Sequence, residues 1–110
     1  MTFVYASLAN GQLPNSKTTL YTSVNETAVK QICLVVVDGA AHTVNIYFKK
    51  NGGTSRRIIP KNMPMDPTSA TGAAQVDCLE NTMEMQAGDV IEGDCSSASA
   101  IDYVISGATR

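Results

Sequence analysis

The sequence predicts an all-β protein built as an antiparallel β-sandwich or jelly roll. Short apolar or alternating runs recur at a spacing of roughly ten residues, turn residues separate them, and no segment has helical periodicity. Thr, Val, Ile and Ser favour strands and turns over helices. With 110 residues, the chain is long enough for one domain and too short for two cores. Periodicity does not choose between the two topologies.

The first sixteen residues are expected to form an extended N-terminal arm outside a sandwich domain of residues 17–110. Apolar side chains mix with the turn pairs Asn10-Gly11 and Pro14-Asn15, a pattern too short and broken for a packed helix. Because such a segment cannot build its own core, we expect it to be mobile in the free protein and ordered on a partner. The candidate partner-binding residues of the arm are Phe3, Val4, Tyr5 and Leu8.

From Lys17 onwards the pattern is strand after strand. The expected strands are 18–22, 28–37, 44–48, 56–59, 74–79, 83–85, 90–93 and 101–106. In 44–48 apolar and polar residues alternate strictly, which is typical of a half-buried strand. In 28–37 both alternating positions are apolar, so both faces are covered, a bulge switches the pointing direction, or a partner covers one face. The proline-containing stretch 60–72 is the longest irregular connection expected.

Charge is divided unevenly along the chain. Residues 1–61 hold seven Lys or Arg against two acids, and residues 62–110 hold one against eight. A basic group flanks the hairpin around Gly52-Gly53, where it either contacts a partner or protects a sheet edge from pairing. Its members are Lys49, Lys50, Arg56, Arg57 and Lys61.

The residues offer little support for catalysis or for a cofactor. His42 is the single histidine and is expected to be an exposed loop residue, and no phosphate-binding loop or metal-binding motif occurs, so no enzyme activity, cofactor or metal is expected. Glu92 and Asp94 should share a strand face, which fits a solvated surface better than a weak calcium site. The three cysteines are expected to be buried free thiols.

Composition also argues against two classes of partner. A net charge of −2 with only six aromatic residues does not favour direct nucleic-acid binding. No apolar run approaches the roughly 20 residues needed to span a bilayer, so no membrane insertion is expected. The first residues lack the basic and apolar regions of a signal peptide, which predicts synthesis in a cytosol.

Four stretches resemble small virion proteins of tailed bacteriophages. They are 8–14 (LANGQLP), 55–61 (SRRIIPK), 86–93 (QAGDVIEG) and 102–107 (DYVISG). Over nearly its full length the chain is similar to the capsid decoration, staple or cement, proteins of short-tailed phages of the epsilon-15 type.

This resemblance implies a jelly-roll-like body with extended terminal arms, made in the bacterial host cytoplasm and located on the outer capsid surface of the virion. The implied role is non-catalytic: the protein would bridge subunits of the major capsid protein, as a homodimer on the shell, and so stabilise the icosahedral capsid. One alternative is a tail or fibre module that binds host carbohydrate, which the absence of Trp disfavours. Another is a fibre subunit that only self-assembles.

Overall fold

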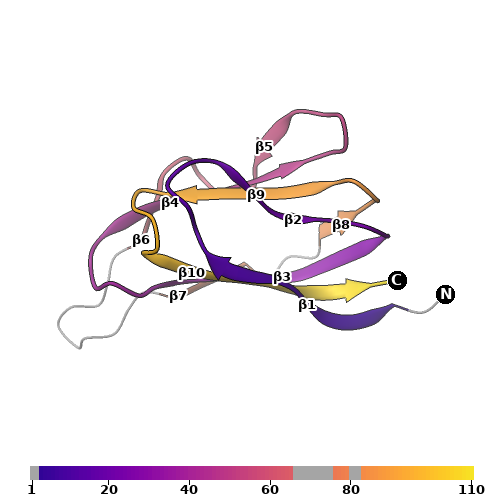
Figure 1. Ribbon diagram of the computed structural model, residues 1–110, viewed down its shortest axis with the longest axis horizontal. Helices are drawn as coiled ribbons and strands as arrows, with labels where there is room; N and C mark the ends of the chain where they lie inside the picture. The colour runs from indigo at the N-terminus through magenta and orange to yellow at the C-terminus, as the bar shows by residue number, and fades with distance from the viewer. Residues whose placement is uncertain (1–2, 66–75, 80–82) are drawn as a thin grey trace.

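The computed structural model describes residues 3–65, 76–79 and 83–110. Over these residues the chain forms two antiparallel sheets packed face to face, and no helix (Figure 1). The strands are β1 (Val4–Gln12), β2 (Thr18–Thr22), β3 (Thr27–Val36), β4 (His42–Lys49), β5 (Ser55–Arg57), β6 (Met63–Met65), β7 (Val76–Leu79), β8 (Met83–Met85), β9 (Val90–Cys95) and β10 (Ile101–Thr109). The expected all-β antiparallel sandwich is therefore confirmed.

Each sheet has five strands. Sheet A has the order β1-β10-β3-β7, with β8 also pairing with β3, and sheet B has the order β2-β9-β4-β5, with β6 also pairing with β4. From β1 to β4, and again from β8 to β10, successive strands lie in opposite sheets. The chain crosses first just after β1, where the Leu13 N–H donates to Ile101 O in sheet A and Pro14 O accepts the Cys95 N–H in sheet B, both at 2.9 Å.

The core fills the space between the sheets. Alternate residues of a strand point to opposite faces, and the inward set is apolar and almost completely shielded from solvent. Its largest fully buried members are Leu13, Leu34, Ile46, Met65, Met85, Ile91, Ile101 and Ile105. Burying side chains of this size stabilises the fold by roughly 1.5–3 kcal/mol each.

Strand β1 departs from the expected arm. Val4 to Gln12 pair with Thr109 to Asp102 of β10, and the following residue, Leu13, is fully buried in the core. The backbone of the first sixteen residues is thus part of the sandwich over 4–12, because the edge of β10 supplies hydrogen-bonding partners that no sequence pattern reveals. An independent arm ending at residue 16 does not describe this segment.

The doubly apolar stretch in β3 is explained by a bulge. The register between β3 and β10 shifts where Ser106 pairs with Gln31 and Gly107 pairs with Val29. Val29 and Ile32 are consequently both buried although they stand three residues apart. The other apolar set, which includes Cys33 and Val35, is half-buried on the outer face of sheet A.

The expectation of three free thiols is wrong for Cys33, which is disulfide-bonded. The backbone register of β3 and β7 places Cys33 opposite Cys78. Spacing in the sequence carries no such information about register. Cys95 is a free, buried cysteine, as expected. The predicted stretch 74–79 is strand over Val76–Leu79, and the rest of it lies outside the described residues.

Candidate functional site

The predicted apolar residues at the start of the chain are exposed, with one exception. The exposed fractions are 40% for Phe3, 62% for Val4 and 81% for Tyr5. Leu8 is half-buried and packs against the core, at the position where the register between β1 and β10 shifts. Three of the four predicted binding residues are therefore available to a partner, and Leu8 mainly holds β1 on the sandwich.

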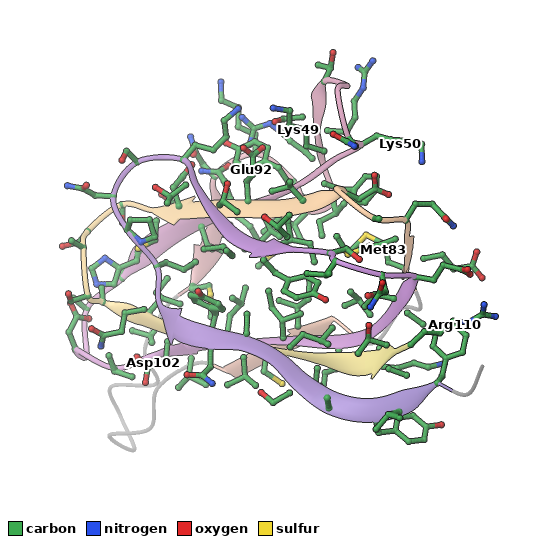
Figure 2. All side chains as sticks on the ribbon, turned by 45° about the vertical axis from the view of Figure 1, so that its right-hand side comes forward. Lys49, Lys50, Met83, Glu92, Asp102 and Arg110 are labelled. Atoms are coloured by element: carbon green, nitrogen blue, oxygen red, sulfur yellow. The ribbon has the colours of Figure 1, made fainter. Side chains whose placement is uncertain are left out.

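Phe3 also contacts the end of β10. The Arg110 guanidinium carbon lies 4.9 Å from the centroid of the Phe3 ring, and Arg110 Nη1 lies 3.2 Å from Glu26 Oε1. The Asn25 side-chain amide donates to Arg110 O at 3.0 Å. These contacts join residue 3, the turn after β2 and the end of β10, where Figure 2 labels Arg110. The exposed side chains of Phe3, Val4 and Tyr5, called the apolar edge below, therefore have a defined position.

Among the described side chains on the outer face of sheet A, three are charged: Lys30 of β3, Glu84 of β8 and Asp102 of β10. Buried Tyr103 and Ile105 alternate with outward-facing Asp102 and Val104, and Val104, which is 44% exposed, pairs directly with half-buried Cys33. A shallow hollow of about 330 Å³ opens between β1 and β10. It is lined by Asn10, Gly11, Gln12, Asp102, Tyr103 and Val104.

Gly11 shapes that hollow. A Cβ atom at position 11 would stand 3.4 Å from the ring of Tyr103, which is 9% exposed, so Gly11 lies directly against this ring. Gln12 Nε2 donates to Asp102 Oδ1 at 3.1 Å at the end of the hollow. This hollow was not expected from the sequence, in which Asn10-Gly11 indicated a turn within an arm, whereas Gly11 lies in strand β1.

The outer face of sheet B is, by contrast, a polar network. Asn45, which is 7% exposed, donates to Asp94 Oδ1 at 2.9 Å and accepts from Arg57 Nη1 at 2.5 Å. Lys17 Nζ and the Arg57 guanidinium carbon each lie 4.9 Å from the centroid of the Tyr47 ring. The charged groups of this face thus bind neutral polar side chains, and two cations lie over the aromatic ring.

Glu92 and Asp94 do lie on this same outer face, as alternation predicted, since both pair with outward residues of β4. Glu92 accepts a hydrogen bond from Ser55, and Asp94 accepts from Asn45 and Tyr47. No group of three or more metal-ligating side chains occurs among the residues that the structure describes.

The cations of the predicted basic hairpin fall into two groups: some contact other side chains of the protein, and others do not. Arg57 belongs to the network around Tyr47, and Lys50 Nζ lies 3.7 Å from Asp89 Oδ2. The side chains of Lys49, Arg56 and Lys61 make no hydrogen bond or ion pair within the described part of the chain. Figure 2 shows Lys49 and Lys50 on the side of the molecule opposite Asp102. The group therefore shares one region, but only some of its charges are available to a partner.

Asp89 organises the turns beneath this hairpin. Its side chain is 2% exposed, and its carboxylate accepts the N–H groups of Asn51 and Gln86, both at 2.9 Å. Burial raises the pKa of Asp89, but these two N–H groups and the Lys50 charge outweigh it and hold the pKa below its usual value. A carboxylate in this position joins the β4–β5 turn to the β8–β9 turn.

His42 is not the exposed loop residue that the sequence suggested. It begins β4, its side chain is 8% exposed, and its Nε2 lies 2.8 Å from both carboxylate oxygens of Asp38. Its Nδ1 lies 3.1 Å from Ser96 Oγ. The residue is covered because the turn before β4 and the loop after β9 meet around it.

This Asp38–His42–Ser96 chain has the residue types of a hydrolase triad. The Ala40 N–H and His42 lower the pKa of Asp38. Because a carboxylate only accepts hydrogen bonds, the nitrogen that faces it, Nε2, donates, and Nδ1 faces the Ser96 hydroxyl. Ser96 Oγ also accepts the Thr43 N–H at 3.1 Å, and the Ser96 N–H donates to Thr43 O at 3.0 Å. These bonds make Ser96 a connector between β4 and the loop after β9.

Comparisons with known proteins give no relative: no family model, no curated protein and no solved structure matches the chain. Among the residues that the structure describes, none lies in a helix capable of crossing a membrane.

Proposed function

We propose that this chain is a non-catalytic virion structural protein that decorates the outside of a phage capsid and bridges major capsid protein subunits. The observation that carries the proposal is the difference between the two outer faces. The sheet A side presents exposed Phe3, Val4 and Tyr5 beside a face with few charged side chains among the described residues, whereas on the sheet B side the charged groups bind neutral polar side chains or lie over the Tyr47 ring. Apolar, charge-poor surface is the kind that a protein partner buries.

A bridging role needs at least two separate contact surfaces. The apolar edge belongs to sheet A, and the free cations Lys49, Arg56 and Lys61 lie around the hairpin of sheet B. Contacts on opposite sides of one small body allow it to hold two neighbouring subunits, and simultaneous binding at several points raises the overall affinity through effective concentration. The cations add electrostatic steering to the apolar anchors.

The strand order supports the jelly-roll form of this proposal. If β5 with β6, and β7 with β8, are each counted as one interrupted edge, each sheet has four strands. Eight strands in two four-stranded sheets, with the first strand beside the last, are typical of jelly rolls. The homodimer expected from the resemblance is part of the proposal, with its interface unassigned.

The carbohydrate-binding alternative has less support. Sugar-binding modules usually present a free aromatic ring, but Tyr47 at the centre of the sheet B face has Lys17 and Arg57 over its ring. Tyr5 is exposed, yet it stands among apolar side chains at the edge and not among polar groups that would bind hydroxyls.

The proposal is tested by co-sedimentation of the purified protein with undecorated shells across a salt series. Replacing Phe3 and Tyr5 by Ala should lower occupancy at every salt concentration, because truncating buried anchors at an interface costs about 2 kcal/mol or more each. Val24→Ala is the matched control, since Val24 is 77% exposed in a turn outside β1. Decorated shells should release their DNA at a higher temperature than undecorated ones. Failure of the wild-type protein to bind shells would refute the proposal.

A further inference from the structure

Strand β1 has one edge that pairs with no other strand among the residues that the structure describes. It lies at the end of sheet A, and its register with β10 occupies only its other edge (Figure 1). In an antiparallel edge strand every second residue directs its N–H and C=O away from its neighbour, so about four residues of β1 present unpaired peptide groups. These groups are a template for another extended segment.

The composition of β1 does not protect this edge. Its nine residues include no charged side chain and no proline, the two devices that most often block pairing. The edge strands of sheet B differ: β5 has three residues, two of them Arg, β6 has three residues with Pro64 at its centre, and β2 has only five. β1 is thus the longest and least protected edge in the described part of the chain.

A bulge divides β1 into two parts of different character. The register shifts between Ser7 and Ala9, which bends the strand and interrupts its outer edge at Leu8. The half before the bulge, Val4–Ser7, has four exposed side chains, among them the apolar Val4 and Tyr5. The half after it is polar and adjoins the hollow at Gly11. An added strand therefore fits the first half best.

We propose that Val4–Ser7 accepts an extended, uncharged segment of the partner protein as an additional strand of sheet A. The inference rests on the proposed function, which supplies the major capsid protein as the partner. Main-chain hydrogen bonds would provide affinity and register, and side chains packed on Val4 and Tyr5 would provide preference for apolar residues. The absence of charge on β1 favours a segment that itself carries none, since β1 offers no counterion to a charge buried on it.

A second copy of the chain fits this edge less well. Two β1 strands related by a two-fold axis through Leu8 would set the apolar Val4 opposite the polar Gln12. Confining the contact to Val4–Ser7 would leave four residues in each copy, far from the roughly 800 Å² per partner of a standard interface. In such an edge-to-edge dimer the two copies of sheet A would form one continuous sheet. The outer face of each copy, which carries Val104, would therefore remain exposed. A different partner can supply the strand and cover the Val104 face as well.

The test compares two lysine substitutions at exposed edge positions, using undecorated shells as the probe. Ser7→Lys places a charge on the proposed edge, and Thr19→Lys places the same charge on β2, the edge of sheet B. With unchanged melting temperatures for both variants, Ser7→Lys should weaken shell binding about tenfold or more, which corresponds to about 1.4 kcal/mol, and Thr19→Lys should bind like the wild-type protein.

Amide hydrogen exchange of the wild-type protein provides a second readout that does not depend on any variant. Amides of residues 4–7 should exchange more slowly on shells than in the free protein, because strand addition engages the backbone. If the protein binds shells but these amides gain no protection and Ser7→Lys binds normally, strand addition is wrong while decoration stands. If the wild-type protein does not bind shells, both fail. If Ser7→Lys instead converts a free dimer to a monomer, the edge is a self-interface and the inference is overturned.

Discussion

The guanidinium of Arg110 lies over the ring of Phe3, with 4.9 Å between its central carbon and the ring centroid. The same guanidinium pairs with Glu26, and the Arg110 N–H donates to Glu26 O at 3.2 Å. One residue after the end of β10 thus contacts both the residue that precedes β1 and the turn that precedes β3. The apolar edge proposed to bind a partner is held in place by the opposite end of the chain.

The first prediction concerns this contact. Arg110→Ala should destabilise the protein by about 0.5–1 kcal/mol, because an exposed cation–π contact and an exposed ion pair each contribute only modestly. Phe3→Leu keeps apolar area and removes the ring, so the two changes together should cost less than the sum of their separate effects. Urea unfolding of the two single variants and the double variant measures this coupling. Strict additivity would show that the ring and the guanidinium do not interact.

The lowered pKa of Asp89 predicts that the stability of the fold depends on pH. Its pKa in the folded protein is lowered, so folding favours the carboxylate, and the stabilisation is fully present above the unfolded value of about 3.9. It is lost as the pH falls through the lower, folded pKa. Asp89→Asn should cost about 2 kcal/mol at pH 7, since charged hydrogen bonds to two N–H groups are lost, and should flatten the acid limb of the stability curve. Asp102→Asn, at a half-buried surface position, is the control.

The disulfide at Cys33 predicts sensitivity to reductant. Thiol titration of the unfolded, unreduced chain should find Cys95 as the free thiol, and Cys33 should become reactive only after reduction. Reduction, or Cys33→Ser, should lower stability by about 2–4 kcal/mol, because a cross-link restricts the unfolded chain. Cys95→Ser, which changes a free thiol, should leave the response of the chain to reductant unchanged. Full reactivity of Cys33 without reductant would contradict this prediction.

Strands with strong local patterns could be predicted from the sequence. Thr18–Thr22 and the alternation of Val44, Ile46 and Phe48 with polar residues were recognised because one apolar face and flanking turns are local properties. β1 and β6 were not recognised. β1 has little alternation and owes its form to pairing with β10, some ninety residues away, and β6 surrounds Pro64, which an edge strand tolerates but a sequence pattern reads as a loop.

In the candidate site, too, features that depend on local sequence could be predicted, and features that depend on pairing between distant strands could not. Exposure of Phe3, Val4 and Tyr5 could be expected, because apolar residues in a segment without its own core remain uncovered. The disulfide at Cys33, the coverage of His42 and the hollow beside Gly11 could not be, since each depends on which strands become neighbours. Register is set by the packing of the whole sandwich and not by adjacent residues.

The Asp38–His42–Ser96 chain predicts a structural effect without chemical reactivity. Ser96→Ala removes the acceptor of the Thr43 N–H and the donor to His42, and should lower stability by about 1 kcal/mol. A fluorophosphonate probe, which labels activated serines, should not modify Ser96 in the wild-type protein. The neighbouring exposed Ser97 serves as the control for both measurements. Stoichiometric labelling of Ser96 that His42→Ala abolishes would instead show an activated nucleophile.

The last prediction separates the two adjacent arginines of the basic hairpin. Arg57 donates to Asn45 and lies over Tyr47, whereas the Arg56 side chain makes no hydrogen bond or ion pair within the described residues. Arg57→Ala should therefore lower the free energy of unfolding by about 1–2 kcal/mol, because buried Asn45 loses a charged donor and Tyr47 loses a cation. Arg56→Ala should unfold like the wild-type protein.

For the rate of association with undecorated shells we expect the opposite: Arg56→Ala should have the larger effect. It should slow binding at low ionic strength and have little effect above about 0.15 M salt, where charges more than about 8 Å apart are screened. Stopped-flow binding and urea unfolding on the same preparations test both halves. Equal effects of the two substitutions on both measurements would mean that the hairpin acts as an undivided basic patch, with no distinction between an engaged and a free arginine.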